Sequence, residues 1–171
     1  MLRHSSTPLS EERVIRRAAP VLMLLAMACG GGPGAAVPQD TATTPEAAVR
    51  NFMQAVADSN IALMGRYWGT SHGPAVETHQ PADYVQRLAV TQAFLRHSPY
   101  RILRSDPVQD DAARRSVQVE VERTDLDGNH CTRDAPFTVI NVGKRGWIVT
   151  AIDLTLLGTP GRACATPART P

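Results

Sequence analysis

The chain has 171 residues, of which 43% are hydrophobic and 20% are charged, and this length fits one domain with extensions. The charged fraction excludes a wholly disordered acidic or basic chain. The formal net charge of +2 argues against a protein that holds nucleic acid through a basic surface. We therefore expect one folded domain and no nucleic-acid partner.

Residues 1–28 have the pattern of a secretory signal. A segment ending in Arg13, Arg16 and Arg17 precedes an almost wholly apolar run from 18 to 28, and this order is typical of export signals. The apolar run has about ten residues, whereas a membrane-spanning helix needs about 20. We expect a removable signal peptide at 1–28, and not a membrane span.

The residues Leu25-Ala26-Met27-Ala28-Cys29-Gly30 resemble the lipobox of bacterial lipoproteins. The resemblance implies that Cys29 receives a diacylglycerol, becomes the first residue of the mature chain and anchors it to a membrane of the cell envelope. Gly30, where an Asp would favour inner-membrane retention, implies the outer membrane if the source has two. Ala26 stands where the family prefers Leu. A plain secretory signal with an unrelated cysteine is the alternative.

The expected mature chain begins with a linker. Residues 29–43 are rich in Gly, Pro, Ala and Thr and have no periodic apolar face, which predicts a flexible tether. The C-terminal tail, 158–171, has a similar composition, so we expect the folded domain at 44–157. Loss of residues 1–28 leaves fourteen basic and fourteen acidic side chains, a balance that selects no acidic partner.

Helical periodicity dominates the first half of this domain. Thr44 is a candidate N-cap and Pro45 favours the first helical position. Apolar residues then recur at helical spacing until a break at 58–60. The expected elements are a helix from Thr44 to this break, a short helix from there to about Tyr67, a loop at 69–80 and a third helix at 81–96.

The period changes to two in the second half. Val117, Val119 and Val121 alternate with polar residues, as in a half-buried antiparallel strand. The expected elements are strands at 100–104, 115–124, 136–142 and 147–156, with turns at 125–129 and 143–146. Helices followed by antiparallel strands predict the α+β class, with the helices on one face of the sheet.

This element order resembles the NTF2-like superfamily, also called SnoaL-like or ketosteroid-isomerase-like. The resemblance is carried by residues 44–52, the break at 55–60, residues 64–68 and the closing Gly146-Trp147-Ile148-Val149. It implies a cone in which a strongly curved sheet wraps around helices, often with a pocket at the open end. Some members are enzymes and others are not. Many dimerise through the open sheet face, and the sequence leaves a homodimer open.

Cysteine usage fits an exported protein. If Cys29 is lipidated, Cys131 and Cys164 remain as an even pair. We expect a disulfide that ties the C-terminal tail to a strand and stabilises the fold by about 3.5 to 4 kcal/mol in the chain-entropy model. Two free thiols are the alternative, since the distance between the two Cα atoms cannot be read from sequence.

Motifs for catalysis, metals and cofactors are missing from the sequence. His72 and His79 lie in the expected loop near Glu77 without the spacing of a zinc site. The glycine-rich segment after Cys29 lacks the strand and the lysine of a nucleotide loop, and no serine-hydrolase elbow occurs. We expect no metal, no cofactor and no assignable catalytic residue.

Five residues are candidates for a pocket inside such a cone. They are Tyr67, Trp68, Tyr84, Asn141 and Asp153. If strand alternation turns Asp153 inward, its carboxylate lies in apolar surroundings and can act as a general base. The alternative places Asp153 in solvent while Ile148, Ile152 and Leu154 fill the core. We prefer this alternative because the second face is more continuously apolar.

Two classes of function follow. The first is a membrane-anchored envelope lipoprotein whose small, non-catalytic domain binds a small apolar ligand or a partner protein. The second is an isomerase, dehydratase or hydrolase of the SnoaL-like type with Asp153 as general base, which rests on fold analogy alone. A solvent-facing Asp153, or an interior filled by Phe52, Met53 and Leu88, would count against the enzyme.

Overall fold

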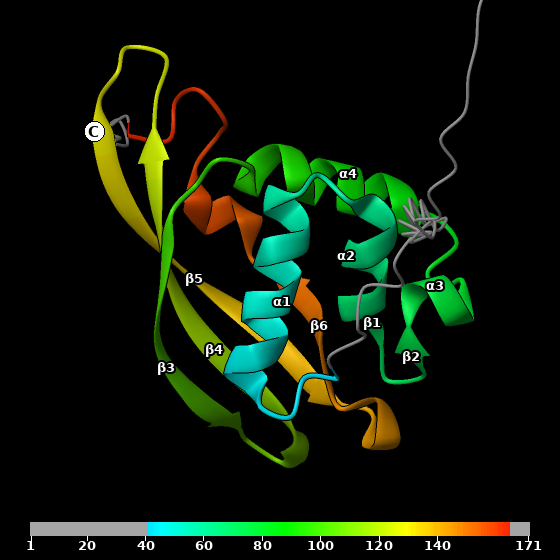
Figure 1. Cartoon of the computed structure of the whole chain (residues 1–171). Helices are drawn as coiled ribbons and strands as arrows, with labels where there is room; N and C mark the ends of the chain where they lie inside the picture. The colour runs from blue at the N-terminus through cyan, green and yellow to red at the C-terminus, as the bar shows by residue number, and fades with distance from the viewer. Residues whose placement is uncertain (1–40, 165–171) are drawn as a thin grey trace, which may run out of the picture. The chain divides into compact units, whose positions relative to one another are not determined.

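The computed structural model of the chain describes residues 41–164. The expected signal peptide, the lipidation site Cys29 and most of the linker therefore lie outside the described residues. The elements in chain order are α1 (Pro45–Ala57), α2 (Ile61–Tyr67), β1 (Gly69–Thr70), β2 (Gly73–Pro74), α3 (Ala75–Thr78), α4 (Tyr84–Leu95), β3 (Tyr100–Val108), β4 (Asp111–Thr124), β5 (His130–Asn141), η1 (Gly143–Arg145), β6 (Trp147–Ile152) and η2 (Leu154–Leu157). The helices lie against one side of a curved antiparallel sheet (Figure 1).

Local capping explains where the first two helices begin. The Oγ1 atom of Thr44 accepts a hydrogen bond from the N–H of Ala47 at 3.1 Å, and the Oδ1 atom of Asn60 accepts one from the N–H of Leu63 at 2.9 Å. Each bond satisfies a backbone donor that the first turn of a helix leaves unpaired. These two helices are confirmed. Helix α4 begins only at Tyr84, because residues 81–83 form a turn.

The segment expected to be a loop at 69–80 contains regular structure. Strands β1 and β2 pair with each other, and α3 follows at once. A Cβ atom at Gly69 would lie 2.2 Å from the carbonyl oxygen of Gly73, so glycine is required for this close approach. The loop prediction is therefore wrong: Gly and Pro mark a tight pairing here and not an absence of structure.

The large sheet has the strand order β3-β4-β5-β6, with every neighbouring pair antiparallel. Val117, Val119 and Val121 of β4 are fully buried, as their alternation predicts. Register shifts interrupt β3 and β5, and such bulges bend a sheet. The α+β class is confirmed, and the arrangement of helices and curved sheet is the one that the NTF2-like resemblance predicts.

The strands differ from expectation at their ends. Strands β3 and β5 extend beyond the expected bounds into the polar segments 105–108 and 130–135, which hydrophobic alternation does not detect. Strand β6 is shorter than expected and ends at Ile152. Asp153 then accepts a hydrogen bond from the N–H of Thr155 and starts the short helix η2. Side-chain bonds of this kind compete with a continuing strand.

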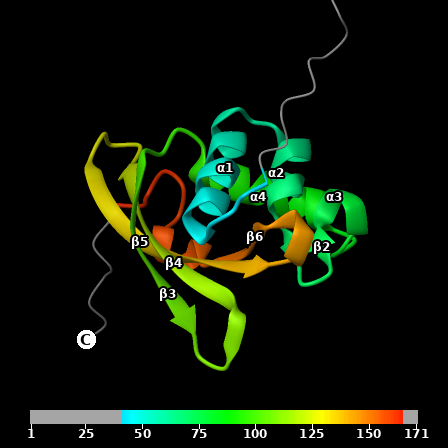
Figure 2. The ribbon, with the colours of Figure 1, turned by 60° about the horizontal axis from the view of Figure 1, so that its bottom comes forward.

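The hydrophobic core fills the space between the helices and the sheet. Figure 2 shows α1 lying along the inner side of the sheet, and α1 contacts all four of its strands. Phe52 and Leu88 from the helices and Phe137 from β5 are fully buried, and Met53 is 3% exposed. These side chains occupy the volume in which a cone of this type would hold an interior ligand.

The C-terminal segment packs onto the far ends of β4 and β5. Cys131 and Cys164 form a disulfide with their Cα atoms 5.5 Å apart, which confirms the predicted pair. The guanidinium of Arg133 donates two hydrogen bonds to the carbonyl oxygen of Ala163, at 3.1 and 2.9 Å. Ala163 itself is buried, as is Ala42. The packed region therefore extends past both expected limits, 44 and 157.

One arginine is buried in this part of the molecule. Arg123 of β4 is 7% exposed and donates hydrogen bonds to the carbonyl oxygen of Phe94, in the last turn of α4, and to the Oγ atom of Ser98. Burial lowers the pKa of its guanidinium. A cation on the last carbonyls of a helix is favourable, so Arg123 fixes the end of α4 against the sheet.

Between residues 41 and 164, every helix is too short or too polar to pass through a membrane.

Candidate ligand-binding site

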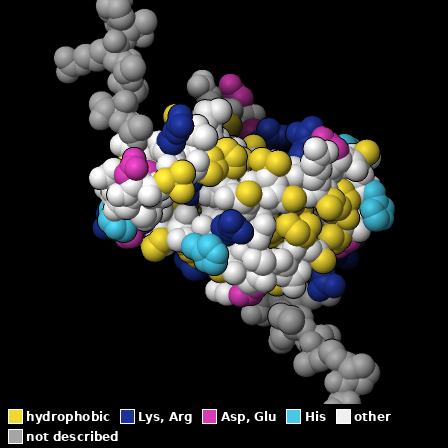
Figure 3. All heavy atoms as spheres, turned by 90° about the horizontal axis from the view of Figure 1, so that it is seen from above, with side chains coloured by type: hydrophobic (Ala, Val, Ile, Leu, Met, Phe, Trp, Pro, Cys, Tyr) yellow, Lys and Arg dark blue, Asp and Glu magenta, His cyan; other side chains and the backbone are white. Residues whose placement is uncertain are grey.

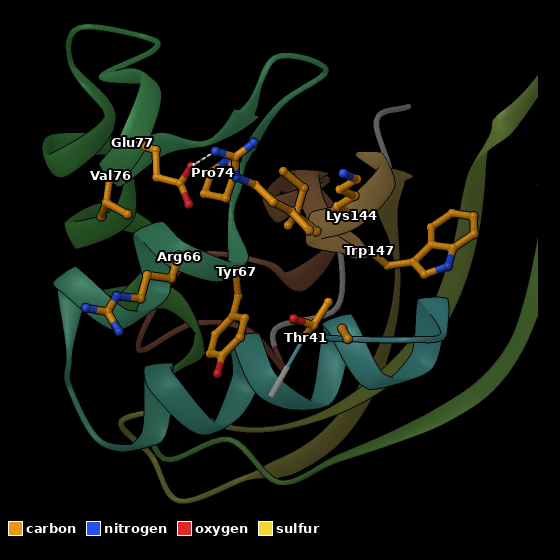
Figure 4. A pocket seen from close by; sticks show the side chains of 11 residues that line it. Thr41, Arg66, Tyr67, Pro74, Val76, Glu77, Lys144 and Trp147 are labelled. Carbon is orange, nitrogen blue, oxygen red and sulfur yellow. Dashed lines mark ion pairs between the residues drawn. The ribbon is translucent and has the colours of Figure 1, made fainter. Parts of the chain in front are cut away.

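The hollow that combines an apolar wall with several charged groups lies at one edge of the molecule. We call it the edge pocket; it is bordered by α2, by the β2–α3 segment, and by η1 with the start of β6 (Figure 4). Its volume is about 300 Å³, at the lower end of the range for small-ligand sites. It is lined by Thr41, Ala42, Arg66, Tyr67, Pro74, Val76, Glu77, Lys144, Arg145, Trp147 and Ile148.

Close backbone approaches position two walls of the edge pocket. Gly146 has a φ of 71°, and a Cβ atom there would lie 2.3 Å from the carbonyl oxygen of Ala42. The same carbonyl accepts a hydrogen bond from the N–H of Trp147 at 2.9 Å. On the other wall, a Cβ atom at Gly65 would lie 2.8 Å from a methyl group of Val76. Glycine therefore lets α3 pack directly on α2.

The charges of the edge pocket do not balance. Glu77 of α3 and Arg145 of η1 form an ion pair of 2.5 Å, drawn as a dashed line across the pocket in Figure 4. Arg66 and Lys144 are exposed and form no ion pair with any residue that the structure describes. With three basic side chains and one acidic one, the lining carries an excess of positive charge.

The aromatic residues of the lining have different orientations. Tyr67 is half-buried and packs against the core cluster. The ring of Trp147 points away from the pocket toward the sheet in Figure 4, and the guanidinium of Arg115 lies over it at 5.7 Å from the ring centroid. The wall that faces the pocket is therefore mostly aliphatic and comes from Pro74, Val76 and Ile148.

A second hollow, which we call the α4 groove, lies between α4 and β6 and has a volume of about 450 Å³. Figure 3 shows hydrophobic side chains gathered over the α4 face, and Val85 and Val90 are 52% and 48% exposed. The ionisable residues of this groove, Asp83 and Arg87, pair with each other at 2.9 Å. No unpaired charge remains in its described lining to select a ligand.

The structure does not gather the five predicted pocket residues. Tyr67 lines the edge pocket and Trp68 lines the α4 groove. Tyr84 packs near the ring of His79, with 6.3 Å between their centroids. Asn141 is exposed and its Oδ1 atom accepts a hydrogen bond from the N–H of Gly143, which closes the turn before β6.

Asp153 lies in solvent. Its carboxylate accepts hydrogen bonds from the backbone N–H and the hydroxyl of Thr155, so it caps η2. The expected alternation does not reach Asp153, because β6 ends one residue earlier. Its surroundings lack the apolar cavity that the general-base hypothesis requires. Together with the filled interior at Phe52, Met53 and Leu88, this placement counts against an enzyme that uses Asp153.

Sequence reasoning missed the charged residues of the edge pocket. The sequence places Glu77 only near two histidines, and it places Lys144 and Arg145 only in an expected turn at 143–146. They come from elements that are distant in the sequence, so no local motif joins them. The signal that the sequence does hold is the pair of consecutive cations in the turn before the closing strand.

Metal-ligating residues do not cluster in this region either. From residue 41 to residue 164, the structure holds no group of three or more His, Cys, Asp or Glu side chains arranged to bind a metal ion. His72 lies near the hydroxyl of Thr70, and His79 near Tyr84. The charged groups available to a ligand at the edge pocket are therefore those of Arg66, Glu77, Lys144 and Arg145.

Comparisons with known proteins add little to this geometry. No protein-family model matches the chain, and no curated protein matches it. Among solved structures, the crystal structure of a protein from Campylobacter jejuni, described as an NTF2-like transpeptidase, is similar. The two are 16% identical, the match covers 63% of this chain and 98% of that chain, and the TM-score is 0.41. The transpeptidase description is a statement about that protein.

Proposed function

We propose that the chain is an exported, lipid-anchored envelope protein whose NTF2-like domain is a binding module, with the edge pocket as its ligand site. Residues 1–28 act as the signal peptide, Cys29 carries the lipid, and residues 29–43 are the tether. The domain binds and positions a small molecule and catalyses no reaction. The observation that carries this proposal is the edge pocket, with its aliphatic wall and with Arg66 and Lys144, which form no ion pair within residues 41–164.

Two features support export. The segment from Leu25 to Gly30 resembles a lipobox, and an apolar run of about ten residues suits a signal peptide better than a span. The disulfide between Cys131 and Cys164 fits an oxidising compartment, because cytoplasmic thiols are kept reduced. Both features agree with a mature chain outside the cytoplasm.

The arrangement of acids supports binding rather than catalysis. A general base needs a carboxylate free to accept a proton from a bound substrate. Glu77 is engaged by Arg145, and Asp153 caps its own helix in solvent. The interior of the sheet, where a desolvated carboxylate could act, is filled by apolar side chains. The charges and the aliphatic wall of the edge pocket suit the recognition of a ligand.

Mass spectrometry of the protein purified from its own membrane tests the anchor. The expected mass is that of a chain that begins at Cys29, carries a diacylglycerol and has Cys131 and Cys164 oxidised. A full-length chain with an uncut leader and a free Cys29 thiol would contradict the proposal. So would a cleaved chain without lipid, which would indicate a plain secretory signal.

Ligand release from the same preparation tests the binding module. A Thr41→Trp variant adds bulk at the mouth of the edge pocket, whereas Thr43→Trp adds the same bulk at an exposed position outside the lining. A small molecule that co-purifies should be lost from the first variant and kept by the second. Equal retention by both variants would place the ligand elsewhere and refute the site.

A further inference from the structure

We infer that the edge pocket takes the headgroup of an anionic phospholipid from the membrane to which the chain is anchored. This inference rests on the proposed lipid anchor at Cys29 and names the ligand class of the proposed site. The domain would then dock on the membrane surface through this pocket and would not hang free on its tether. Three observations carry the argument: charge, shape and the point where the tether joins the domain.

The charge of the pocket selects an anion. Glu77 neutralises Arg145, which leaves Arg66 and Lys144 without a carboxylate partner among the described residues. The two cations come from different elements, α2 and η1, and in Figure 4 the side chain of Arg66 extends away from Lys144. A guanidinium can donate two parallel hydrogen bonds to a phosphate, and an ammonium attracts it as a point charge. A phosphate at the mouth of the pocket can pair with either cation, and the net positive charge of the lining favours an anionic ligand.

The shape of the pocket selects a headgroup rather than a whole lipid. Its volume of about 300 Å³ suits a group of headgroup size. Pro74, Val76 and Ile148 form an aliphatic wall next to the cations. A glycerol unit and the first carbons of the acyl chains can lie against this wall while the phosphate stays at the charged mouth. A fully polar anion would leave this wall without a contact.

The tether joins the domain at the pocket itself. The described chain begins at Thr41, which lines the pocket, and Ala42 is hydrogen-bonded to the first residue of β6. Thr41 lies twelve positions after Cys29. A fully extended chain of that length spans roughly 40 Å, at most about 3.6 Å for each residue, and a Gly-rich chain spans roughly 20 Å on average. The tether therefore keeps the pocket within reach of the membrane, where tethering raises its effective concentration.

Energy transfer on vesicles tests the inference with the full lipidated mature chain. The chain has two tryptophans, and a Trp68→Phe background leaves Trp147, at the edge pocket, as the donor. The acceptor is a trace of lipid with a dansyl-labelled headgroup, in vesicles of phosphatidylcholine with or without phosphatidylglycerol. We expect stronger transfer with phosphatidylglycerol, and a decrease at high salt because the attraction is screened. Equal transfer in both kinds of vesicle would overturn the inference.

A charge-matched pair of variants separates the pocket from general attraction. Arg66→Gln with Lys144→Gln removes the two unpaired cations of the pocket. Arg96→Gln with Arg162→Gln removes two exposed cations outside its lining. The ratio of docked to undocked domain should fall roughly fivefold for each pocket cation lost, and the control should keep the wild-type transfer. An equal loss in both doubles would indicate a diffuse surface effect and would refute a headgroup site.

Two further experiments distinguish a failure of the proposed lipid anchor from a failure of the headgroup site. Co-flotation of the chain with phosphatidylcholine vesicles reports the lipid on Cys29 alone, so its loss refutes the proposed anchor and not the pocket. Soluble glycerol phosphate is the second probe. Binding of this probe by the wild type, with transfer that does not depend on phosphatidylglycerol, would show a site for a free phosphate ester and would overturn the membrane docking.

Discussion

The interior of the domain and its edge pocket use the same helices in opposite ways. The interior between α1, α4 and the sheet is apolar, with Phe52 and Leu88 fully buried. The edge pocket, between α2, α3 and η1, is open and carries four charged side chains. The comparison separates a packed interior, which stabilises the fold, from the rim, where the proposed ligand site lies. Variants should therefore separate the free energy of unfolding from ligand binding.

The largest effect on stability is expected from Phe52→Ala. Removing a fully buried aromatic side chain costs about 3 to 5 kcal/mol, because apolar contacts are lost and a cavity remains. Chemical denaturation measures the loss in the free energy of unfolding. Val85→Ala, at a position that is 52% exposed, should change it by less than about 0.5 kcal/mol. A loss below 1 kcal/mol at Phe52 would mean that the interior is not the tightly packed region described.

Removal of the disulfide should have the next largest effect. Replacing Cys131 and Cys164 with serine frees a loop with a sequence separation of 33 and should lower the free energy of unfolding by about 2 to 5 kcal/mol. Thermal unfolding with and without a reductant measures this loss of stability. The wild type should respond to the reductant and the double variant should not. Because the bond lies away from the edge pocket lining, vesicle docking of the folded variant should be unchanged.

Substitutions in the Glu77–Arg145 ion pair should change vesicle docking with little change in stability. Glu77→Gln removes a half-exposed pair, so stability should change by less than about 1 kcal/mol. The pocket gains one unit of positive charge, and transfer to phosphatidylglycerol vesicles should increase. Arg145→Gln breaks the same pair but lowers the charge by one, and transfer should decrease. Changes in the same direction for both variants would show that the pair acts through structure and not through charge.

The smallest effect concerns pH at the β4–β5 turn. Hydrogen bonds from the side chain and then the backbone of Asn129 lower the pKa of the Asp125 carboxyl. A lowered pKa means that the ionised carboxylate stabilises the fold. This contribution is complete above the unfolded value of about 3.9 and is lost as the pH falls through the lower folded value. An NMR titration should show Asn129→Ala raising the pKa of Asp125, and an unchanged value would contradict the assigned cause.

Sequence reasoning succeeded where structure is set by neighbouring residues. Thr44 and Asn60 cap helices through bonds that span three residues, and the valines of β4 alternate with its pleat. Sequence reasoning failed where contacts between segments distant in the sequence determine the local structure. The approach of Gly69 to Gly73 made a hairpin from an expected loop, and the capping bond of Asp153 ended β6 early. Alternation that continued past that point would turn Asp153 inward, which is why the sequence suggests Asp153 for the interior.

The candidate site was less predictable than the fold. Tyr67 was the one pocket candidate that lines the edge pocket. Glu77 and Arg145 come from segments that pack closely through glycine: Gly65 lets α3 pack on α2, and Gly146 lets the chain before α1 approach β6. Such pairing depends on tertiary contacts, which leave no periodic signal in a single sequence.

The outer strand β3 has a consequence for proteins crowded together on a surface. An unpaired strand edge invites another chain to add to the sheet. Strand β3 forms one edge of its sheet and carries the exposed residues Arg101, Arg104 and Pro107, with two interruptions of its register. Arg101 and Arg104 are paired with Glu120 and Asp106, so it is the missing donor of Pro107 and the local kinks that discourage such growth. These features disfavour growth of the sheet by addition of another strand to β3.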